Sequence, residues 1–146
     1  MIYIGIDPGK KGGIAVITDN DVKTYAYSDR QLIFTLRNVN DECICFVEKV
    51  GAMPGQGVTS MFNFGKSFGY ILGTLEVCSV PYQLVPPQKW KKEYSLGHDK
   101  GESIAVCRRL FPEVSLLPTE RCRTESDGMA EALLIAEYGR RITGRE

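Results

Sequence analysis

The fold is decided at the start of the chain, by the stretch Met1-Ile2-Tyr3-Ile4-Gly5-Ile6-Asp7-Pro8-Gly9-Lys10-Lys11-Gly12-Gly13. An apolar run of strand length delivers Asp7 directly into the turn signal Pro8-Gly9. A carboxylate at the end of a buried strand costs free energy unless a cation, a basic side chain or backbone donors meet it. We therefore take Asp7 as the first candidate ligand of a metal site.

The segments that follow predict a meander and then a buried strand. Residues 14–18 and 22–27 form strands two and three, joined by a turn at residues 19–21, and residues 30–38 form a short helix. Residues 43–48 are a continuous apolar run that ends in Glu48, which is typical of a strand covered on both faces.

The second half of the chain alternates strands and helices. A Gly- and Pro-rich loop at 51–57 precedes a helix at 59–77, in which Gly65, Gly69 and Gly73 create a flat face suited to packing on the sheet or on a partner helix. A strand at 80–85, a basic loop at 88–94 and helices at 100–111 and 125–141 complete the pattern. This order predicts an α/β fold with a mixed five-stranded sheet flanked by helices, in a single domain spanning residues 1–146.

Composition sets further limits. No apolar run approaches the roughly 20 residues that cross a bilayer, and no signal peptide is visible, so we expect a cytoplasmic protein. Net charge is zero, which by itself argues against a nucleic-acid-binding protein. Its distribution is uneven, however: residues 1–48 carry seven acids against five bases, and residues 89–109 carry six bases against three acids. An acidic site beside a basic surface is compatible with these numbers.

Four acids form the candidate site. Asp7 and Glu48 each end an apolar strand, and Asp127 and Glu131 are four residues apart, on one face of a helix. Such carboxylates repel one another unless a divalent cation neutralises them, and oxygen ligands select Mg²⁺ or Mn²⁺ over zinc. Two such ions can activate a water and stabilise the leaving oxygen in phosphodiester cleavage.

Each acid also has a plainer explanation. Asp127 could belong to a capping box with Thr124, Glu48 and Glu131 could be surface charges, and Asp7 could begin an Asp-Pro-Gly turn. Taken singly, each explanation is at least as good as a metal site. It is less satisfactory to explain all four acids separately in this way, because two of them end apolar strands and the other two form a pair on a helix.

Three motifs in this order resemble the RuvC-like Holliday junction resolvases: Ile4-Gly5-Ile6-Asp7-Pro8-Gly9 with Gly12-Gly13-Ile14-Ala15, then Phe46-Val47-Glu48, then Asp127-Gly128-Met129-Ala130-Glu131-Ala132. The resemblance implies a ribonuclease-H-like fold, a homodimer, two Mg²⁺ ions per active site (or Mn²⁺ in their place) and paired nicking of four-way DNA junctions. Asp7, Glu48, Asp127 and Glu131 match the family's four acids. The four-residue spacing of the last two is similar to the phage and plastid branch, which implies the host cytoplasm if the chain is phage-encoded.

The resemblance also suggests which residues bind DNA. Lys100 looks like the family's basic catalytic residue, and Phe62 lies in the region where the family places groups that open the junction. For Lys89, Trp90, Lys91 and Lys92 we expect phosphate and stacking contacts, with a solvated loop and a core Trp90 as the alternative. Lys10 and Lys11 could steer phosphate to the metals, and His98 is either a general base or a surface residue.

The function predicted is that of a Holliday junction resolvase, a divalent-metal-dependent endonuclease acting on branched DNA without a membrane or a small-molecule cofactor. The alternatives are an RNase H or general branched-DNA nuclease of the same fold, and a non-catalytic junction-binding protein. An actin-like nucleotide-binding protein is disfavoured because 146 residues leave no room for a second lobe.

Overall fold

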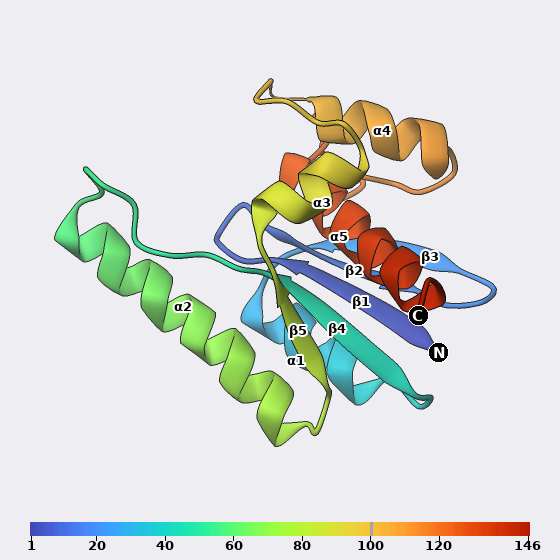
Figure 1. The fold of residues 1–146 in the computed structure, drawn as a ribbon, viewed down its shortest axis with the longest axis horizontal. Helices are drawn as coiled ribbons and strands as arrows, with labels where there is room; N and C mark the ends of the chain where they lie inside the picture. The colour runs from blue at the N-terminus through green and yellow to red at the C-terminus, as the bar shows by residue number, and fades with distance from the viewer. Residues whose placement is uncertain (100) are drawn as a thin grey trace.

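A mixed five-stranded sheet lies at the centre of the computed structural model, which describes residues 1–99 and 101–146 (Figure 1). Its strand order is β3-β2-β1-β4-β5. β1 (Ile2–Asp7), β2 (Gly13–Ile17) and β3 (Val22–Ala26) form the antiparallel meander, and β4 (Cys43–Glu48) and β5 (Tyr82–Val85) run parallel to β1. The predicted mixed α/β sheet is confirmed.

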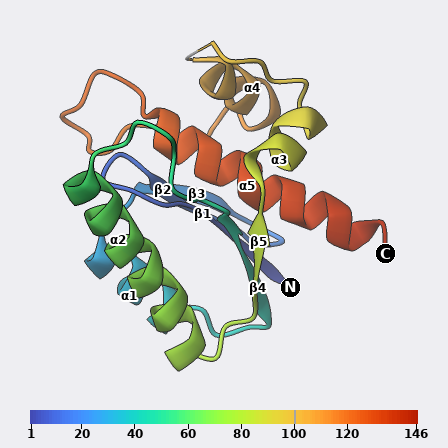
Figure 2. The same cartoon turned by 60° about the vertical axis from the view of Figure 1, so that its left-hand side comes forward.

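Helices cover both faces of this sheet (Figures 1 and 2). α1 (Asp29–Arg37) and α2 (Val58–Val77) cover one face. α5 (Asp127–Gly144) crosses the other face, with α3 (Pro87–Glu93) and α4 (Glu102–Leu110) packed beside it. Strand alternation assigns side chains to these two layers, so Ile4 and Ile6 of β1 lie under α1 and α2.

α5 approaches β1 unusually closely because two glycines leave room for it. A side chain at Gly5 would meet the carbonyl oxygen of Ala132, and would come within 2.6 Å of the nitrogen of Ala136. At the start of α5, a side chain at Gly128 would meet the backbone of Lys11 and Gly12. The first turns of α5 are therefore held against the turn that follows β1.

Most element boundaries differ from the predicted ones by one to three residues, and one element differs in kind. The predicted basic loop at 88–94 is wrong, because residues 87–93 form α3, which begins with Pro87 in the first turn. β5 begins at Tyr82 rather than Val80. The cap of α5 is Ser126, whose hydroxyl accepts a hydrogen bond from the Met129 amide, so the capping box with Thr124 is also wrong.

α2 is largely exposed. Its buried residues are Ile71 and Leu75, and the positions of Gly65, Gly69 and Gly73 have open space where a side chain would stand. Packing of the glycine face on the sheet, one of two predicted possibilities, is therefore wrong. Within the described ranges, no helix combines the length and apolar composition that crossing a membrane requires.

Candidate active site

Asp7 and Glu48 end two adjacent parallel strands. β1 and β4 pair through Gly5 with Phe46 and Ile6 with Val47, and the two acids directly follow these pairs. Phe46 belongs to the core under α5, and alternation along β4 places Glu48 on that same face. Gly5 of β1 lies against α5, so alternation along β1 places the Asp7 side chain, two residues later, on the α5 face as well. The prediction that the two acids share one edge of the sheet is confirmed.

Glu131 joins them from α5. Burial, followed by the nearby charges of Glu131 and Glu48, raises the pKa of Asp7 well above its ordinary value. A protonated Asp7 donates a hydrogen bond to Glu131, which favours the protonated form further. The Glu48 pKa is also raised, first by burial and then by Glu131. Three carboxyl groups from β1, β4 and α5 therefore act on one another electrostatically.

Asp127 lies one helical turn before Glu131 and is exposed. Both side chains line a surface cavity of about 250 Å³, together with Lys91, His98 and Glu102. The expectation that Asp127 and Glu131 share a helix face is confirmed. Glu131 links this cavity to Asp7 and Glu48.

Lys91 is the basic residue that the structure places beside the acids. Its charge lowers the pKa of both Asp7 and Glu48, opposing the effect of burial. It also lines the cavity with Asp127 and Glu131, and its Nζ lies 5.6 Å from the centre of the Trp90 ring. The sequence suggested Lys91 as one of several phosphate contacts, whereas the structure distinguishes it from its neighbours.

Trp90 does not stack on bases in this structure. Its ring is fully buried, with 0% exposure, and its indole Nε1 donates a hydrogen bond of 2.8 Å to Oε2 of Glu48. The predicted stacking contact is wrong, and the alternative of a core tryptophan is confirmed. Trp90 and Tyr94 are four residues apart, a spacing that could have indicated a helix with one buried face.

Solved structures similar to this chain include Holliday junction resolvases. Thermus thermophilus RuvC, in complex with a Holliday junction substrate, matches with a TM-score of 0.64 and 16% identity over 97% of this chain and 96% of its own. Fowlpox virus resolvase, in a complex with substrate Holliday junction DNA, matches with a TM-score of 0.55 and 19% identity over 95% of this chain and 98% of its own. The chain has the ribonuclease-H-like fold of the RuvC-type resolvases.

The yeast mitochondrial Holliday junction resolvase also matches, with a TM-score of 0.55 and 15% identity over 97% of this chain and 78% of that protein. No protein-family model matches the sequence, and no curated protein matches it. The similarity therefore concerns the course of the backbone more than the residues along it.

The remaining predicted residues lie around the acids or apart from them. Lys10, Lys11, Lys89 and Lys92 are exposed, and Phe62 in α2 is 71% exposed. Lys11 lies in the turn that meets Gly128 at the start of α5. His98 is exposed and lines the cavity with Glu131. Lys100 lies outside the described residues.

The carboxylate side chains of the site are ligands suited to a divalent cation, although they do not converge on a single point. In the described part of the chain, no three His, Cys, Asp or Glu side chains are grouped tightly enough to hold one metal ion. Asp7, Glu48 and Glu131 nevertheless offer carboxylate oxygens, which Mg²⁺ and Mn²⁺ prefer. Burial and then the neighbouring acids raise the pKa of Asp7, and a bound cation would oppose both effects by favouring the ionised carboxylate.

Proposed function

We propose that this chain is a Holliday junction resolvase, a divalent-metal-dependent endonuclease that nicks opposed strands of four-way DNA junctions. The observation that carries the proposal is the placement of Asp7 and Glu48 at the ends of adjacent parallel strands, on the sheet face covered by α5, which carries Glu131. This placement occurs on a fold similar to that of solved resolvases. A structural role would not require three carboxyl groups from three elements to share a partly buried site. A phosphodiesterase that uses metal ions does require it.

The acids would hold the metal and Lys91 would balance their charge. Asp7, Glu48 and Glu131 are the proposed ligands, and Asp127, which lines a surface cavity with Glu131, completes the set. If bound there, two Mg²⁺ or Mn²⁺ ions per site would supply neutralisation of the scissile phosphate and activation of a water. In the net reaction the water oxygen would bond to phosphorus and lose one proton, while the bond to the 3′-oxygen would break and the leaving oxygen would gain one proton. The products are a 5′-phosphate and a 3′-hydroxyl.

Exposed basic residues give the DNA a path to the acids. Lys10 and Lys11 belong to the turn that leads from Asp7 towards the start of α5, and Lys89 and Lys92 flank Lys91 on α3. Phosphate contacts of this kind position DNA without reading its sequence. The Asp-Gly-Met-Ala-Glu-Ala stretch supports the phage and plastid branch. A single nuclease domain and a cytoplasmic location belong to the same proposal.

We assign the dimer contact to α2. Its exposed apolar side chains include Val58 at 85% and Phe62 at 71%, and the flat face of Gly65, Gly69 and Gly73 is open. A helix that exposes this much apolar surface is typical of an interface. Contact between two copies of α2 gives a closed two-fold dimer, the commonest assembly. Two active sites in one dimer account for two nicks in one junction.

The substrate panel that tests the function contains a labelled four-way junction, a linear duplex and an RNA–DNA hybrid, each incubated with the protein in Mg²⁺. We expect symmetric nicks in the junction alone. Cleavage of the hybrid alone would contradict the proposal in favour of an RNase H. Binding of the junction without cleavage in either Mg²⁺ or Mn²⁺ would identify a non-catalytic junction-binding protein.

A further inference from the structure

A partly buried hydrogen bond joins one of the proposed metal ligands, Glu48, to the core tryptophan. The Trp90 indole Nε1 donates to Oε2 of Glu48 over 2.8 Å, although 42 residues separate the two in the chain. A buried indole N–H needs an acceptor. Using a carboxylate ties the tryptophan to an ionisable side chain of the candidate site.

The contact fixes one end of Glu48 and leaves the other end available. Among the described residues, Oε2 is the Glu48 oxygen that accepts a hydrogen bond, so Oε1 keeps its lone pairs for a cation. The Trp90 ring is fully buried in the core beneath α5, so its N–H cannot follow a moving carboxylate. Glu48 is therefore confined to a narrow range of side-chain torsions.

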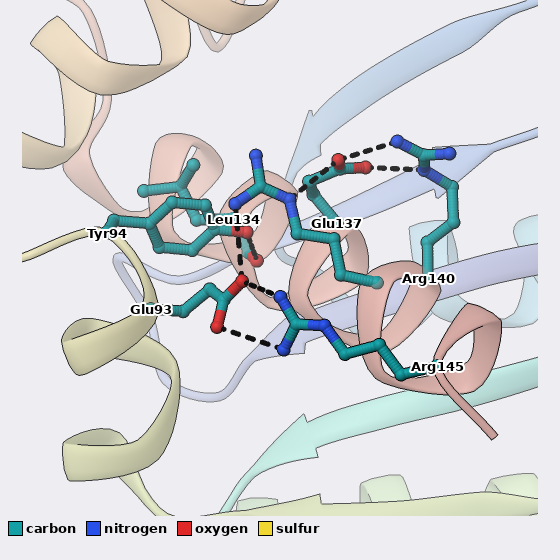
Figure 3. Close-up of polar contacts among 7 residues, drawn as sticks. Glu93, Tyr94, Leu134, Glu137, Arg140 and Arg145 are labelled. Carbon is teal, nitrogen blue, oxygen red and sulfur yellow. Dashed lines mark hydrogen bonds and ion pairs between the residues drawn. The ribbon is translucent and has the colours of Figure 1, made fainter.

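α3, which carries Trp90, is itself held firmly against α5. The hydroxyl of Tyr94 donates to the Leu134 carbonyl over 2.7 Å, and Glu93 forms an ion pair with Arg145 at 2.6 Å (Figure 3). Arg141 adds a second ion pair to Glu93 at 3.4 Å and lies over the Tyr94 ring. Several separate contacts therefore share the attachment of α3 to α5, so the position of Trp90 does not depend on any one of them.

We infer that Trp90 is a positioning residue, whose indole N–H orients the Glu48 carboxylate for metal binding. The inference rests on the proposed function, since it assumes that Glu48 is a metal ligand. Partners that hydrogen-bond to a metal ligand contribute about 10- to 100-fold to metal affinity. A tryptophan that served packing alone would contribute to stability and leave metal affinity unchanged.

The test removes the N–H and keeps the ring. Trp90 is the chain's one tryptophan, so growth on β-(3-benzothienyl)alanine, in which sulfur replaces the indole N–H, changes this position alone. Mn²⁺ affinity of the full chain is then measured by isothermal titration calorimetry. Tyr94→Phe is the matched control, because it removes a buried hydrogen bond from the end of α3 without touching Glu48. Trp90→Phe is a second variant that also removes the N–H.

We expect the sulfur analogue to bind Mn²⁺ about 10- to 100-fold more weakly than the wild type, with Tyr94→Phe less stable but unchanged in Mn²⁺ affinity. In the wild type, Mn²⁺ should also change the Trp90 emission, and Glu48→Gln should abolish that change. Equal Mn²⁺ affinity of the analogue and the wild type would overturn this inference alone. Failure of the wild type to bind Mn²⁺ would overturn the proposed nuclease site and this inference with it.

Discussion

The raised pKa of Asp7 predicts how the stability of the protein depends on pH. The folded protein raises the Asp7 pKa through burial, Glu131 and Glu48, in that order. The folded state thus holds this proton more tightly than the unfolded chain does. The favourable contribution is complete below the ordinary value of 3.8 and is lost as pH rises through the raised pKa.

We therefore expect Asp7→Asn to raise the free energy of unfolding at pH 7 in EDTA, measured by urea denaturation, with the difference vanishing below about pH 4. Mg²⁺ should reverse the order, because a ligand at 100 times its Kd stabilises the wild type by about 2.7 kcal/mol and the variant has lost a ligand. A variant less stable than the wild type at pH 7 without metal would contradict this account of Asp7.

Lys91 is the second residue whose role can be isolated. Lys91→Met removes the charge that opposes the raised pKa of Asp7 and Glu48, and we expect kcat on a four-way junction to fall about 10²- to 10³-fold. Lys89→Met and Lys92→Met change exposed residues of the same helix. They should weaken junction binding and reduce its salt dependence by about one charge, with kcat retained. Equal loss of kcat in all three would contradict a special position for Lys91.

Among individual residues, the sequence indicates those whose position follows from local pattern. Asp7 and Glu48 could be predicted as site residues because each ends an apolar run. If the two strands are adjacent and parallel, as β1 and β4 are, residues at their carboxyl ends lie side by side. The hydrogen bond from Trp90 to Glu48 and the effect of the Lys91 charge on the acids could not be predicted in the same way. The hydrogen bond joins α3 to β4 across 42 residues, and both features depend on how α3 packs.

At the scale of elements, the placement of α5 on the sheet depends on the absence of side chains. A methyl group at Gly5 would meet the Ala132 carbonyl and come within 2.6 Å of the Ala136 nitrogen. We expect Gly5→Ala to lower the free energy of unfolding by about 1–3 kcal/mol, measured by urea denaturation, because the helix must move away from β1. The same shift should weaken Mg²⁺ binding, since Glu131 moves with α5. A neutral Gly5→Ala variant would contradict the close approach.

α3 shows why an element can be misassigned from sequence. Pro86-Pro87 and the lysines that follow suggest a loop, because proline and charge are common in loops. Proline is also favoured in the first turn of a helix, where its missing N–H costs nothing, and this is where Pro87 lies. The remaining helices were predictable because their apolar residues recur every three or four positions.

At the scale of the whole molecule, the exposed glycine face of α2 predicts a dimer. Gly69→Glu has open space in one protomer, so we expect the helix and the thermal transition to be retained. If two copies pack through this face, the same change should raise the dimer dissociation constant at least about tenfold, as a buried charge costs several kcal/mol. Sedimentation equilibrium measures this constant. Gly144→Glu, at an open position at the end of α5, is the control.

An unchanged dimer in Gly69→Glu would move the interface elsewhere, and a monomeric wild type would contradict the dimer itself. Neither the order of elements nor the spacing of apolar residues could settle this point. The sequence allowed the glycine face to pack either on the sheet or on a partner helix. In the structure of one protomer this face does not pack on the sheet.

The central claim is that the carboxyl groups brought together from β1, β4 and α5 cut branched DNA. The measurement that tests it most directly is cleavage and binding of one labelled four-way junction by the wild type, Asp7→Asn and Glu131→Gln in Mg²⁺. We predict that each variant loses at least about 10³-fold in cleavage rate while it binds the junction as tightly as the wild type. Wild-type cleavage that persists in either variant would contradict the claim.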